Sequence, residues 1–430
     1  MYRNIYANLL EWKCSVDRKP LILNGARQVG KTYILQEFGQ KEYEKLALIS
    51  LDRNRNARDV IERGGEVDYL LKALSAISSV DITPGNTLLV LDEVQACPKA
   101  IELLKYLCED APQYHVAVAG SLLGVSMHEG VSFPVGKVDE LRLYPMTFDE
   151  FVRAMGKGVL ADALQRCDWA VVDALGEELT LLLRQYYFVG GMPSAVKSYA
   201  GDGGPAAVRR IQQQILSDYR RDFSKHVPGR DLPKVNMVWD SIPSQLAREN
   251  RKFLFGAMKK GGRAAEFENA IQWLTDAGLA YRVTRVSKPQ LPLKFYEDAS
   301  AFKLFMLDCG LMGAMVDASS ESMMVSGDIF TEYKGAFTEL YVYTQLAAKG
   351  LPIYYHSVDN STIEIDFLVA HCDRVVPIEV KAETNVRSKS LRTFIDTHPG
   401  LKGLRLSMRP RDSQSWMDNY PLYACQLLFG

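Results

Sequence analysis

The sequence of 430 residues contains no apolar run that approaches the roughly 18 residues needed to cross a bilayer. Residues 1–14 also lack the uninterrupted apolar core and the small-residue cleavage site of a secretory signal. Both absences argue against a membrane-spanning or secreted protein. We therefore expect a cytoplasmic protein without a membrane partner.

An excess of charge of one sign is missing as well. The chain has 51 lysines and arginines against 52 aspartates and glutamates, so its formal net charge is -1. The molecule as a whole has no electrostatic attraction for nucleic acid or acidic membranes, and any such affinity must be local. The seven cysteines are scattered, with no C-x-x-C pair and no histidine-rich neighbour. We expect reduced, mostly buried thiols. We find no internal repeat or low-complexity tract.

Short apolar runs alternate with helical stretches between residue 21 and about residue 147. We expect strands at 21–23, 47–51, 87–91 and 115–119. Nearly continuous apolar strands separated by helices are typical of a parallel sheet that is covered on both faces. The pattern predicts an α/β domain in this part of the chain, and the total length leaves room for one or two more domains.

The segment from Gly25 to Thr32 matches the pattern G-x-x-x-x-G-K-[ST] between a strand and a helix. Such a loop brings backbone N–H groups to phosphates, its lysine pairs with the β- and γ-phosphates, and its hydroxyl can ligate Mg²⁺. It predicts an ATP/ADP site made by Gly25, Ala26, Arg27, Gln28, Val29, Gly30, Lys31, Thr32 and the following Tyr33.

A second motif, the apolar run 88–91 followed by Asp92 and Glu93, completes this site. Asp92 would hold the Mg²⁺ shell with Thr32, and Glu93 would orient and deprotonate the attacking water with Lys31 on the phosphates. Ser121 follows the strand 115–119, where it could sense the γ-phosphate or simply cap a helix. Nucleotide binding without hydrolysis remains an alternative, and Arg27, Lys137 and Arg142 are equal candidates for an activating cation.

The middle of the chain is helical from about residue 149 to residue 200, with a break at 190–193 that suggests a lid. A basic helix from Val208 to Lys234 follows, and 253–286 has the order of a winged helix-turn-helix. These segments could contact DNA, although a solvated cationic helix and a protein-binding winged helix are the plainer alternatives.

Strand-like runs at 353–358, 362–370 and 374–382 predict an antiparallel meander, followed by a helix at 388–396 and a strand at 403–406. Charged residues interrupt two of these apolar strands. Asp366, Glu379 and Lys381, with Glu339 from the preceding helix, could bind Mg²⁺ or Mn²⁺ and hydrolyse phosphodiesters. A solvated cross-strand ion pair is the alternative.

The chain resembles, over nearly its full length, prokaryotic AAA-family ATPases fused to a C-terminal PD-(D/E)XK nuclease-like domain. The resemblance rests on residues 25–32, 88–95, 119–121, 144–151, 190–193, 302–308, 333–339 and 365–381. It implies an ATPase domain, a winged-helix connector and a restriction-endonuclease-like α/β domain. We place these at 1–150, 236–325 and 326–430, with a helical lid and basic linker in 151–235. Where relatives often carry Gly-Arg, this chain has Gly136-Lys137, which puts turnover in doubt.

Three hypotheses about function follow. The leading one is an ATP-driven switch in which the nucleotide state controls the winged helix and a nuclease-like site on DNA. The second is an ATP-gated regulatory or protein-interaction module, whose nuclease-like domain is a non-catalytic scaffold. A translocase is the third, although the chain has no second set of motor motifs. A protein partner and a homo-oligomer are compatible with each of them.

Overall fold

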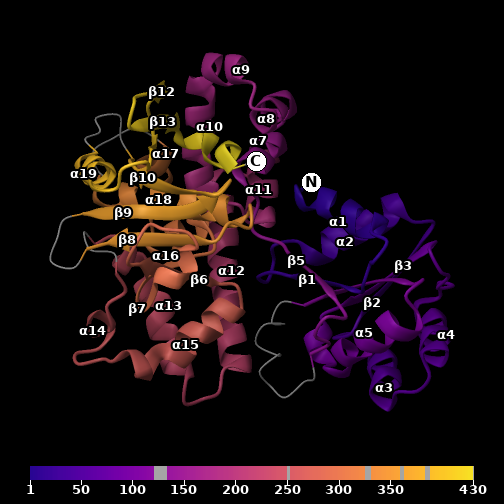
Figure 1. Ribbon diagram of the computed structural model, residues 1–430. Coiled ribbons are helices and arrows are strands. Elements are labelled where there is room, and N and C mark those ends of the chain that lie inside the picture. The colour runs from indigo at the N-terminus through magenta and orange to yellow at the C-terminus, as the bar shows by residue number, and fades with distance from the viewer. Residues whose placement is uncertain (121–132, 249–251, 325–330, 359–362, 383–387, 430) are drawn as a thin grey trace. The chain divides into compact units, whose positions relative to one another are not determined.

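The computed structural model describes residues 1–120, 133–248, 252–324, 331–358, 363–382 and 388–429. The chain forms two compact units. Unit 1 comprises residues 1–144 with 276–278, and unit 2 comprises residues 145–275 with 279–430 (Figure 1). Each unit is described by itself below.

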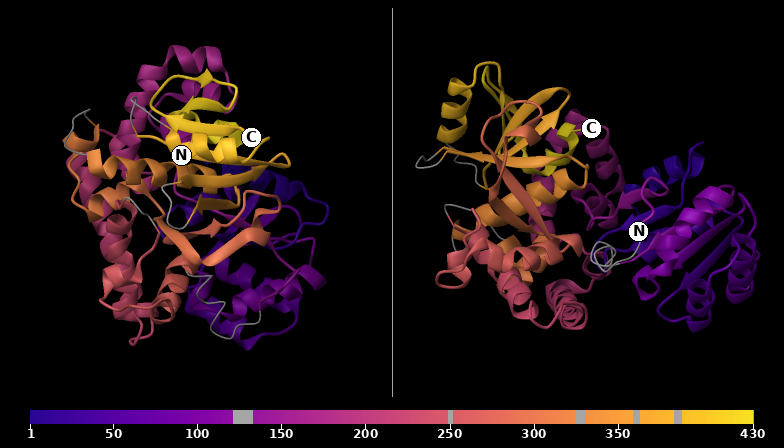
Figure 2. Two further views of the ribbon diagram at one scale, coloured as in Figure 1. Left: turned by 60° about the vertical axis from the view of Figure 1, so that its left-hand side comes forward. Right: turned by 60° about the horizontal axis from the view of Figure 1, so that its bottom comes forward.

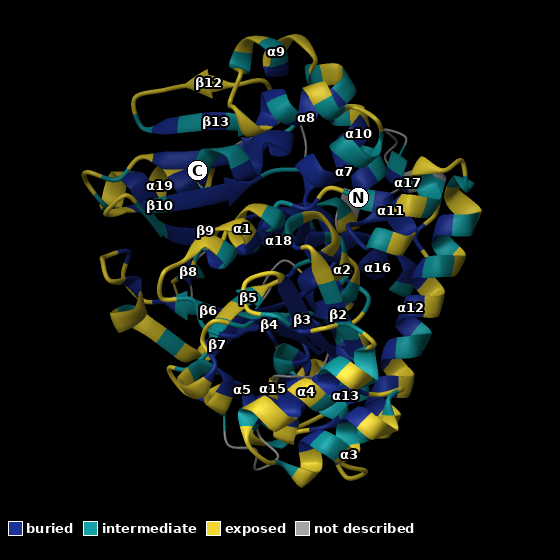
Figure 3. Ribbon diagram, turned by 90° about the vertical axis from the view of Figure 1, so that its right-hand side faces the viewer, coloured by how far each residue is buried: buried dark blue, intermediate teal, exposed yellow. Residues whose placement is uncertain are grey.

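The core of unit 1 is a parallel sheet with the strand order β2-β3-β4-β1-β5. β3 and β4 are buried along their whole length, as their uninterrupted apolar sequences require (Figure 3). The strands are β1 (Leu21–Asn24), β2 (Lys45–Ser50), β3 (Thr87–Asp92), β4 (His115–Ala119) and β5 (Asp139–Arg142). The predicted α/β domain with a parallel sheet is confirmed.

Helices cover both faces of this sheet, with α1 and α2 on one face and α3, α4 and α5 on the other (Figure 2). Aliphatic side chains of α3, α4 and α5 pack with those of β2, β3 and β4 into one buried cluster. The helical elements of unit 1 are α1 (Ile5–Cys14), α2 (Lys31–Glu42), α3 (Arg55–Arg63), α4 (Val67–Ser78), η1 (Val94–Ala96) and α5 (Lys99–Asp110).

Unit 2 begins with helices. They are α7 (Phe148–Ala154), α8 (Gly158–Gln165), α9 (Trp169–Ala174), α10 (Gly176–Val189), α11 (Pro193–Ala200), α12 (Gly204–His226), α13 (Leu232–Leu246), α14 (Phe255–Met258) and α15 (Ala264–Asp276). The expected break at 190–193 separates α10 from α11. The basic stretch 208–234, in contrast, is not one helix. It is divided between α12 and α13, because Pro228 and Gly229 interrupt the helical backbone.

The second sheet has the strand order β12-β13-β11-β10-β9-β8-β6-β7. Its strands are β6 (Ala280–Val286), β7 (Glu297–Met306), β8 (Ile353–Ser357), β9 (Glu364–His371), β10 (Arg374–Val380), β11 (Gly403–Ser407), β12 (Asp412–Ser413) and β13 (Met417–Pro421). The remaining helical elements are η2 (Leu293–Tyr296), α16 (Cys309–Met315), α17 (Ser320–Met324), α18 (Thr331–Ala347), α19 (Lys389–Thr397) and η4 (Leu422–Phe429).

β8, β9 and β10 form the predicted antiparallel meander, whereas β11 and β13 continue the sheet in parallel. The antiparallel pair β6–β7 joins the same sheet beside β8, where Arg285 pairs with Tyr355. The helices α13, α14 and α15 followed by this pair have the element order of a winged helix. The proposed boundary at residue 325 therefore separates strands of one continuous sheet.

Three motifs that carried the resemblance meet inside unit 2. Asp308 accepts hydrogen bonds from the backbone N–H of Gly191 at 2.6 Å and of Leu311 at 2.9 Å. The Gly191 carbonyl in turn accepts from the Met146 N–H at 2.7 Å. A Cβ at Gly190 would lie 2.2 Å from an Asp308 oxygen, so this crossing point requires glycine. Burial raises the pKa of Asp308 to about 6.

All seven cysteines are free, and no helix among the described residues is both long and apolar enough to span a bilayer. Cys97, Cys309 and Cys425 are buried. The expectation of mostly buried thiols is only partly met, because the other four are exposed or half-buried.

Candidate functional site

The predicted phosphate-binding loop lies between β1 and α2, and its backbone needs glycine at its first position. Gly25 has a φ of +149°, and a Cβ there would lie 2.3 Å from the Leu143 carbonyl oxygen. Gln28 and Gly30 also have positive φ values, of 67° and 99°. These turns deliver the chain to the N-terminus of α2 at Lys31, where free backbone N–H groups favour an anion.

Lys31 is 8% exposed and folds back onto the loop. Its ammonium donates to the carbonyl oxygens of Gly25 at 2.7 Å and Ala26 at 2.8 Å. Burial lowers the pKa of Lys31 to about 8, and the nearby Glu93 and Asp92 oppose this shift. Since an ammonium has three donors, two bonds to the loop leave one for a phosphate oxygen.

Asp92 ends β3 and lies within hydrogen-bond distance of the loop. The Thr32 hydroxyl donates to Asp92 Oδ2 at 2.7 Å. Burial raises the pKa of Asp92, while the Thr32 bond lowers it. A hydroxyl and a carboxylate in contact form a donor set that suits Mg²⁺. The side chains of Thr32 and Asp92 therefore fit the predicted cation, which they would hold.

Glu93 follows in the left-handed region, with a φ of 54°, which is a strained conformation for a residue with a side chain. Its carboxylate accepts a hydrogen bond from the Gln95 side chain. Ser121, the third predicted catalytic residue of this domain, lies outside the described residues. Tyr33 is exposed on α2, where its hydroxyl accepts from the N-terminal ammonium at 2.8 Å.

The three candidate activating cations have different surroundings. Lys137 forms an ion pair with Glu109 at 2.9 Å, Arg142 lies 5.6 Å from the ring centre of Tyr144, and Arg27 is exposed. None of these contacts selects one of them as an activating residue.

Arg3 is a residue of this site that the sequence did not reveal. Its buried guanidinium donates to the carbonyl oxygens of Val29 at 2.8 Å and Tyr144 at 2.5 Å. It thereby ties the loop to the segment that follows β5. An isolated arginine ahead of the first strand gives no sequence signal for such a role.

Asp366, Glu379 and Lys381 come together at adjacent strand ends in unit 2. The β9–β10 ladder reaches the pair Phe367 and Ile378, so Asp366 and Glu379 follow directly on facing strands. Asp366 Oδ2 accepts from the Val380 N–H at 2.7 Å, and Lys381 Nζ lies 2.5 Å from Glu379 Oε1. Burial and the neighbouring Asp366 raise the pKa of Glu379 to about 7.

Arg405 extends this group across the sheet. Glu379 pairs in register with Arg405 on β11, and Arg405 pairs with Asn419 on β13. The Arg405 Nε donates to Asn419 Oδ1 at 2.7 Å. The sequence carried a signal, because Arg405 interrupts the apolar strand 403–406 in the same way that Asp366 and Glu379 interrupt theirs.

The structure does not bring Glu339 into the same group. Its carboxylate Oε2 lies 3.8 Å from the ammonium of Lys303 on β7. Among the described residues, no three carboxylate, histidine or cysteine side chains gather to hold a metal ion. The role of Glu339 as a third metal ligand stays a prediction that this arrangement does not support.

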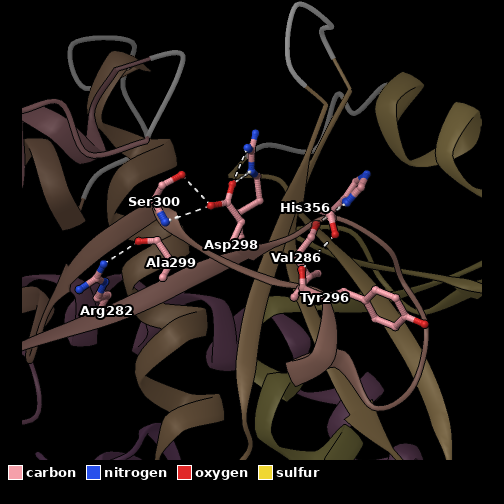
Figure 4. A network of polar contacts seen from close by, with 9 residues as sticks. Arg282, Val286, Tyr296, Asp298, Ala299, Ser300 and His356 are labelled. Carbon is pink, nitrogen blue, oxygen red and sulfur yellow. Dashed lines mark hydrogen bonds and ion pairs between the residues drawn. The ribbon is translucent and has the colours of Figure 1, made fainter.

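Cations of the proposed DNA-binding segments have mixed surroundings. On the β6–β7 pair, Arg282 donates to the Ala299 carbonyl at 2.7 Å (Figure 4). It also forms an ion pair with Glu268 at 2.6 Å. Arg285 likewise pairs with Asp298 at 2.6 Å. On α12, Arg220, Arg221 and Lys225 line a shallow groove with Ser217 and Ser224. Arg220 and Arg221 also form ion pairs, with Asp240 at 2.7 Å and with Asp218 at 3.3 Å, but both are more exposed than Arg282 and Arg285.

A family described as an AAA domain matches residues 17–152, which contain the loop, Thr32, Asp92 and Glu93. This region has the fold of a P-loop NTPase and is similar to AAA domains. Residues 180–322 and 334–425 match two further families, each described as a domain of unknown function. The three matches follow one another along the chain, and the second ends between β7 and α18, before Glu339 and Asp366.

Among solved structures, the chain is similar to a Walker-type ATPase of Pyrococcus abyssi, PABY2304, with 14% identity and a TM-score of 0.47 over 73% of this chain and 95% of that one. The Aeropyrum pernix ORC1 protein in complex with DNA has 13% identity and a TM-score of 0.31 over 74% and 93% of the two chains. The Thermotoga maritima RuvB Holliday junction branch migration motor has 15% identity and a TM-score of 0.27 over 67% and 89%. These likenesses are too distant to assign a function. No curated protein sequence matches the chain.

Proposed function

We propose that the protein is a Mg²⁺-dependent ATPase whose nucleotide state controls a DNA-binding region and a nuclease-like carboxylate site in unit 2. The contact between Thr32 and Asp92 carries the first half, because it joins the phosphate-binding loop to the strand that ends in Asp92 and is followed by Glu93. The proposal assigns Lys31 to the phosphates and Glu93 to the attacking water. When bound, Mg²⁺ would neutralise charge on the phosphates.

Control of unit 2 by the nucleotide rests on one short segment of chain. At its start, the Leu143 N–H donates to the Asn24 carbonyl at 2.8 Å, directly beside Gly25. Five residues later, the Phe148 N–H donates to Gln345 on α18 at 2.8 Å. α18 is the helix that carries Glu339. A rearrangement of the loop that displaces Leu143 would therefore displace residues 143–148, whose last residue is hydrogen-bonded to α18.

The carboxylate site supports the second half of the proposal. Glu379 Oε2 is buried without a hydrogen-bond partner, and Asp366 lies beside it. A buried carboxylate oxygen of this kind fits a divalent cation, which Asp366 and Glu379 would hold. A bound cation would polarise a phosphodiester. Lys381, with a side chain 35% exposed, would orient the attacking water from the open side.

A second candidate function is the ATP-gated regulatory module with a non-catalytic nuclease-like scaffold. The observation that favours it is that Glu339 Oε2 lies 3.8 Å from the Lys303 ammonium, while no three carboxylate, histidine or cysteine side chains of the described residues gather to hold a metal ion. In this alternative, the charged side chains of unit 2 stabilise its fold and take no part in hydrolysis.

The test is ATP hydrolysis by wild type and Glu93→Gln, with and without duplex DNA, together with Mg²⁺- or Mn²⁺-dependent cleavage of that DNA. We expect hydrolysis that DNA stimulates and that falls by 10²- to 10⁴-fold in Glu93→Gln, as general-base removal does. The exposed Glu11 on α1 provides a matched control, because Glu11→Gln should retain wild-type turnover.

Cleavage should disappear in Asp366→Ala and in Lys381→Ala while ATP hydrolysis persists. Cleavage that survives in both variants would reject the catalytic role of the carboxylate site. Tight ATP binding with neither stimulation nor cleavage would instead leave the regulatory module as the function.

A further inference from the structure

Lys303 is one of the most deeply buried side chains of the described residues, with 0% of its surface exposed. It lies on β7 and is separated from Asp366 and Glu379 by more than sixty residues of sequence. Its ammonium is 2.5 Å from Glu364 Oε1 on β9 and 3.8 Å from Glu339 Oε2 on α18. The same ammonium lies 5.0 Å from the ring centre of Tyr355, whose face favours a cation.

A lysine without solvent access is retained only when nearby anions compensate its charge. Here two carboxylates from separate elements converge on one ammonium, which is the arrangement in which two carboxylates would otherwise bind a metal ion. Lys303 belongs to the region 180–322, whereas Glu339 and Glu364 belong to the region 334–425. The positive charge that compensates Glu339 and Glu364 therefore comes from Lys303, which lies outside the C-terminal family region.

The geometry points to Lys303 as a built-in cation that takes the place of a second metal ion. We propose that its ammonium neutralises Glu339 and Glu364, so that unit 2 binds a single divalent cation through Asp366 and Glu379. The inference rests on the metal-binding half of the proposed function. Lys303 is a positioning residue in this account, since it holds Glu339 away from the cation without touching the substrate.

Charge counting agrees with one cation. The four carboxylates of Glu339, Glu364, Asp366 and Glu379 stand against the ammonium groups of Lys303 and Lys381. With all six groups charged the sum is -2, and the Arg405 guanidinium, which lies in register with Glu379, reduces it to -1, so the negative charge is not enough for two divalent ions. A second divalent ion would leave an excess of positive charge in a buried region, and this is unfavourable.

The test measures Mn²⁺ binding to the full-length, nucleotide-free protein by calorimetry and electron paramagnetic resonance. Every protein carries Asp92→Asn, so that the loop of unit 1 adds no metal site. We expect one Mn²⁺ per chain. Glu379→Gln should weaken this binding at least tenfold, whereas Glu339→Gln should change it less than threefold. A loss in Glu339→Gln equal to that in Glu379→Gln would make Glu339 a ligand and overturn the proposal.

Lys303→Gln removes the cation instead of a carboxylate, so it leaves Glu339 and Glu364 without the ammonium that neutralises them. We expect this variant to bind a second Mn²⁺, and Lys303→Arg, which keeps the charge, to bind one. Circular dichroism shows whether Lys303→Gln folds. If the variant folds and binds no additional Mn²⁺, the proposal is contradicted. If Lys303→Gln does not fold, the comparison of Glu339→Gln with Glu379→Gln decides.

Failure of the proposed function has a different signature. Wild-type unit 2 that binds no Mn²⁺ would remove the nuclease-like role. A gain of Mn²⁺ in Lys303→Gln would even then support the role of Lys303 as the resident cation.

Discussion

The nucleotide site of unit 1 and the carboxylate site of unit 2 both place charged side chains at the ends of buried strands, but they stabilise these charges in different ways. In unit 1, Lys31 bonds to the loop that carries it, and Thr32, the residue after Lys31, donates to Asp92 at the end of β3. In unit 2, Glu379 faces Arg405 from another strand, and Glu339 faces Lys303 from a hairpin that precedes it in the chain.

The difference explains why one site follows from a short motif and the other does not. A loop that supplies its own partners has nearly the same geometry wherever its residues occur, because glycine positions and a helix N-terminus determine it. A site whose partners come from distant strands depends on the topology of the whole sheet. The chemistry of unit 2 is therefore sensitive to changes far from its carboxylates.

The largest contrast is expected from Lys31→Ala. Loss of the buried ammonium should weaken ATP binding by about 100-fold or more, equivalent to ~2.7 kcal/mol, because it removes a charge-assisted contact to the phosphates. Lys41→Ala on the same helix is the control, since its exposed ammonium forms an ion pair with Glu37 at the surface. Calorimetry with ATP measures both. Mn²⁺ binding by unit 2 should be unchanged. A loss of Mn²⁺ affinity in Lys31→Ala would mean that the two sites are energetically coupled.

Gly25→Ala tests whether the backbone alone defines the loop. The added Cβ would meet the Leu143 carbonyl, so we expect a loss of about 2–4 kcal/mol in stability together with weaker ATP binding. Gly85→Ala is matched to it, because Gly85 also has a positive φ but has no atom within 4 Å of an added Cβ. The control should cost only about 1 kcal/mol and leave ATP binding intact. Equal effects in thermal melting and calorimetry would refute the steric argument.

Much of unit 1 was predictable because its signals are local. The apolar runs predicted four strands of the parallel sheet, and the motif residues Lys31, Thr32, Asp92 and Glu93 lie together as expected. Arg3 was missed, since nothing in the sequence near it indicates that it reaches Val29.

Less of unit 2 was predictable. Alternation and turn residues predicted the meander of β8, β9 and β10, but no local pattern indicated that β6 pairs with β8. The partners Lys303 and Arg405 depend on that topology, so they could not be assigned. The break between α12 and α13 could have been predicted from the sequence, because Pro228 and Gly229 are strong helix terminators.

Arg405→Met should remove the central residue of the row formed by Glu379, Arg405 and Asn419 on neighbouring strands. Its removal leaves Glu379 beside Asp366 with less compensation and deprives Asn419 of a donor, so we expect a loss of about 2–3 kcal/mol in stability. Arg411→Met is the control, because its ion pair with Asp173 at 3.2 Å is exposed and should contribute less than about 1 kcal/mol. Thermal melting in EDTA measures the stability of both variants. Equal decreases in melting temperature would show that Arg405 stabilises the fold no more than an exposed ion pair does.

The smallest effect is a pH dependence at Glu379. Because the folded protein keeps this carboxyl protonated up to about pH 7 and the unfolded chain releases the proton near 4.5, stability is lost as the pH rises between these values. Glu379→Gln lacks this loss. In EDTA, it should therefore gain about 1 kcal/mol, or roughly 2–4 °C in melting temperature, relative to wild type between pH 5.5 and pH 8. The coupling to Asp366 keeps the gain below the full value for an isolated group. A difference in melting temperature that does not change with pH would mean that Glu379 is ionised throughout, as an open, solvated carboxylate would be.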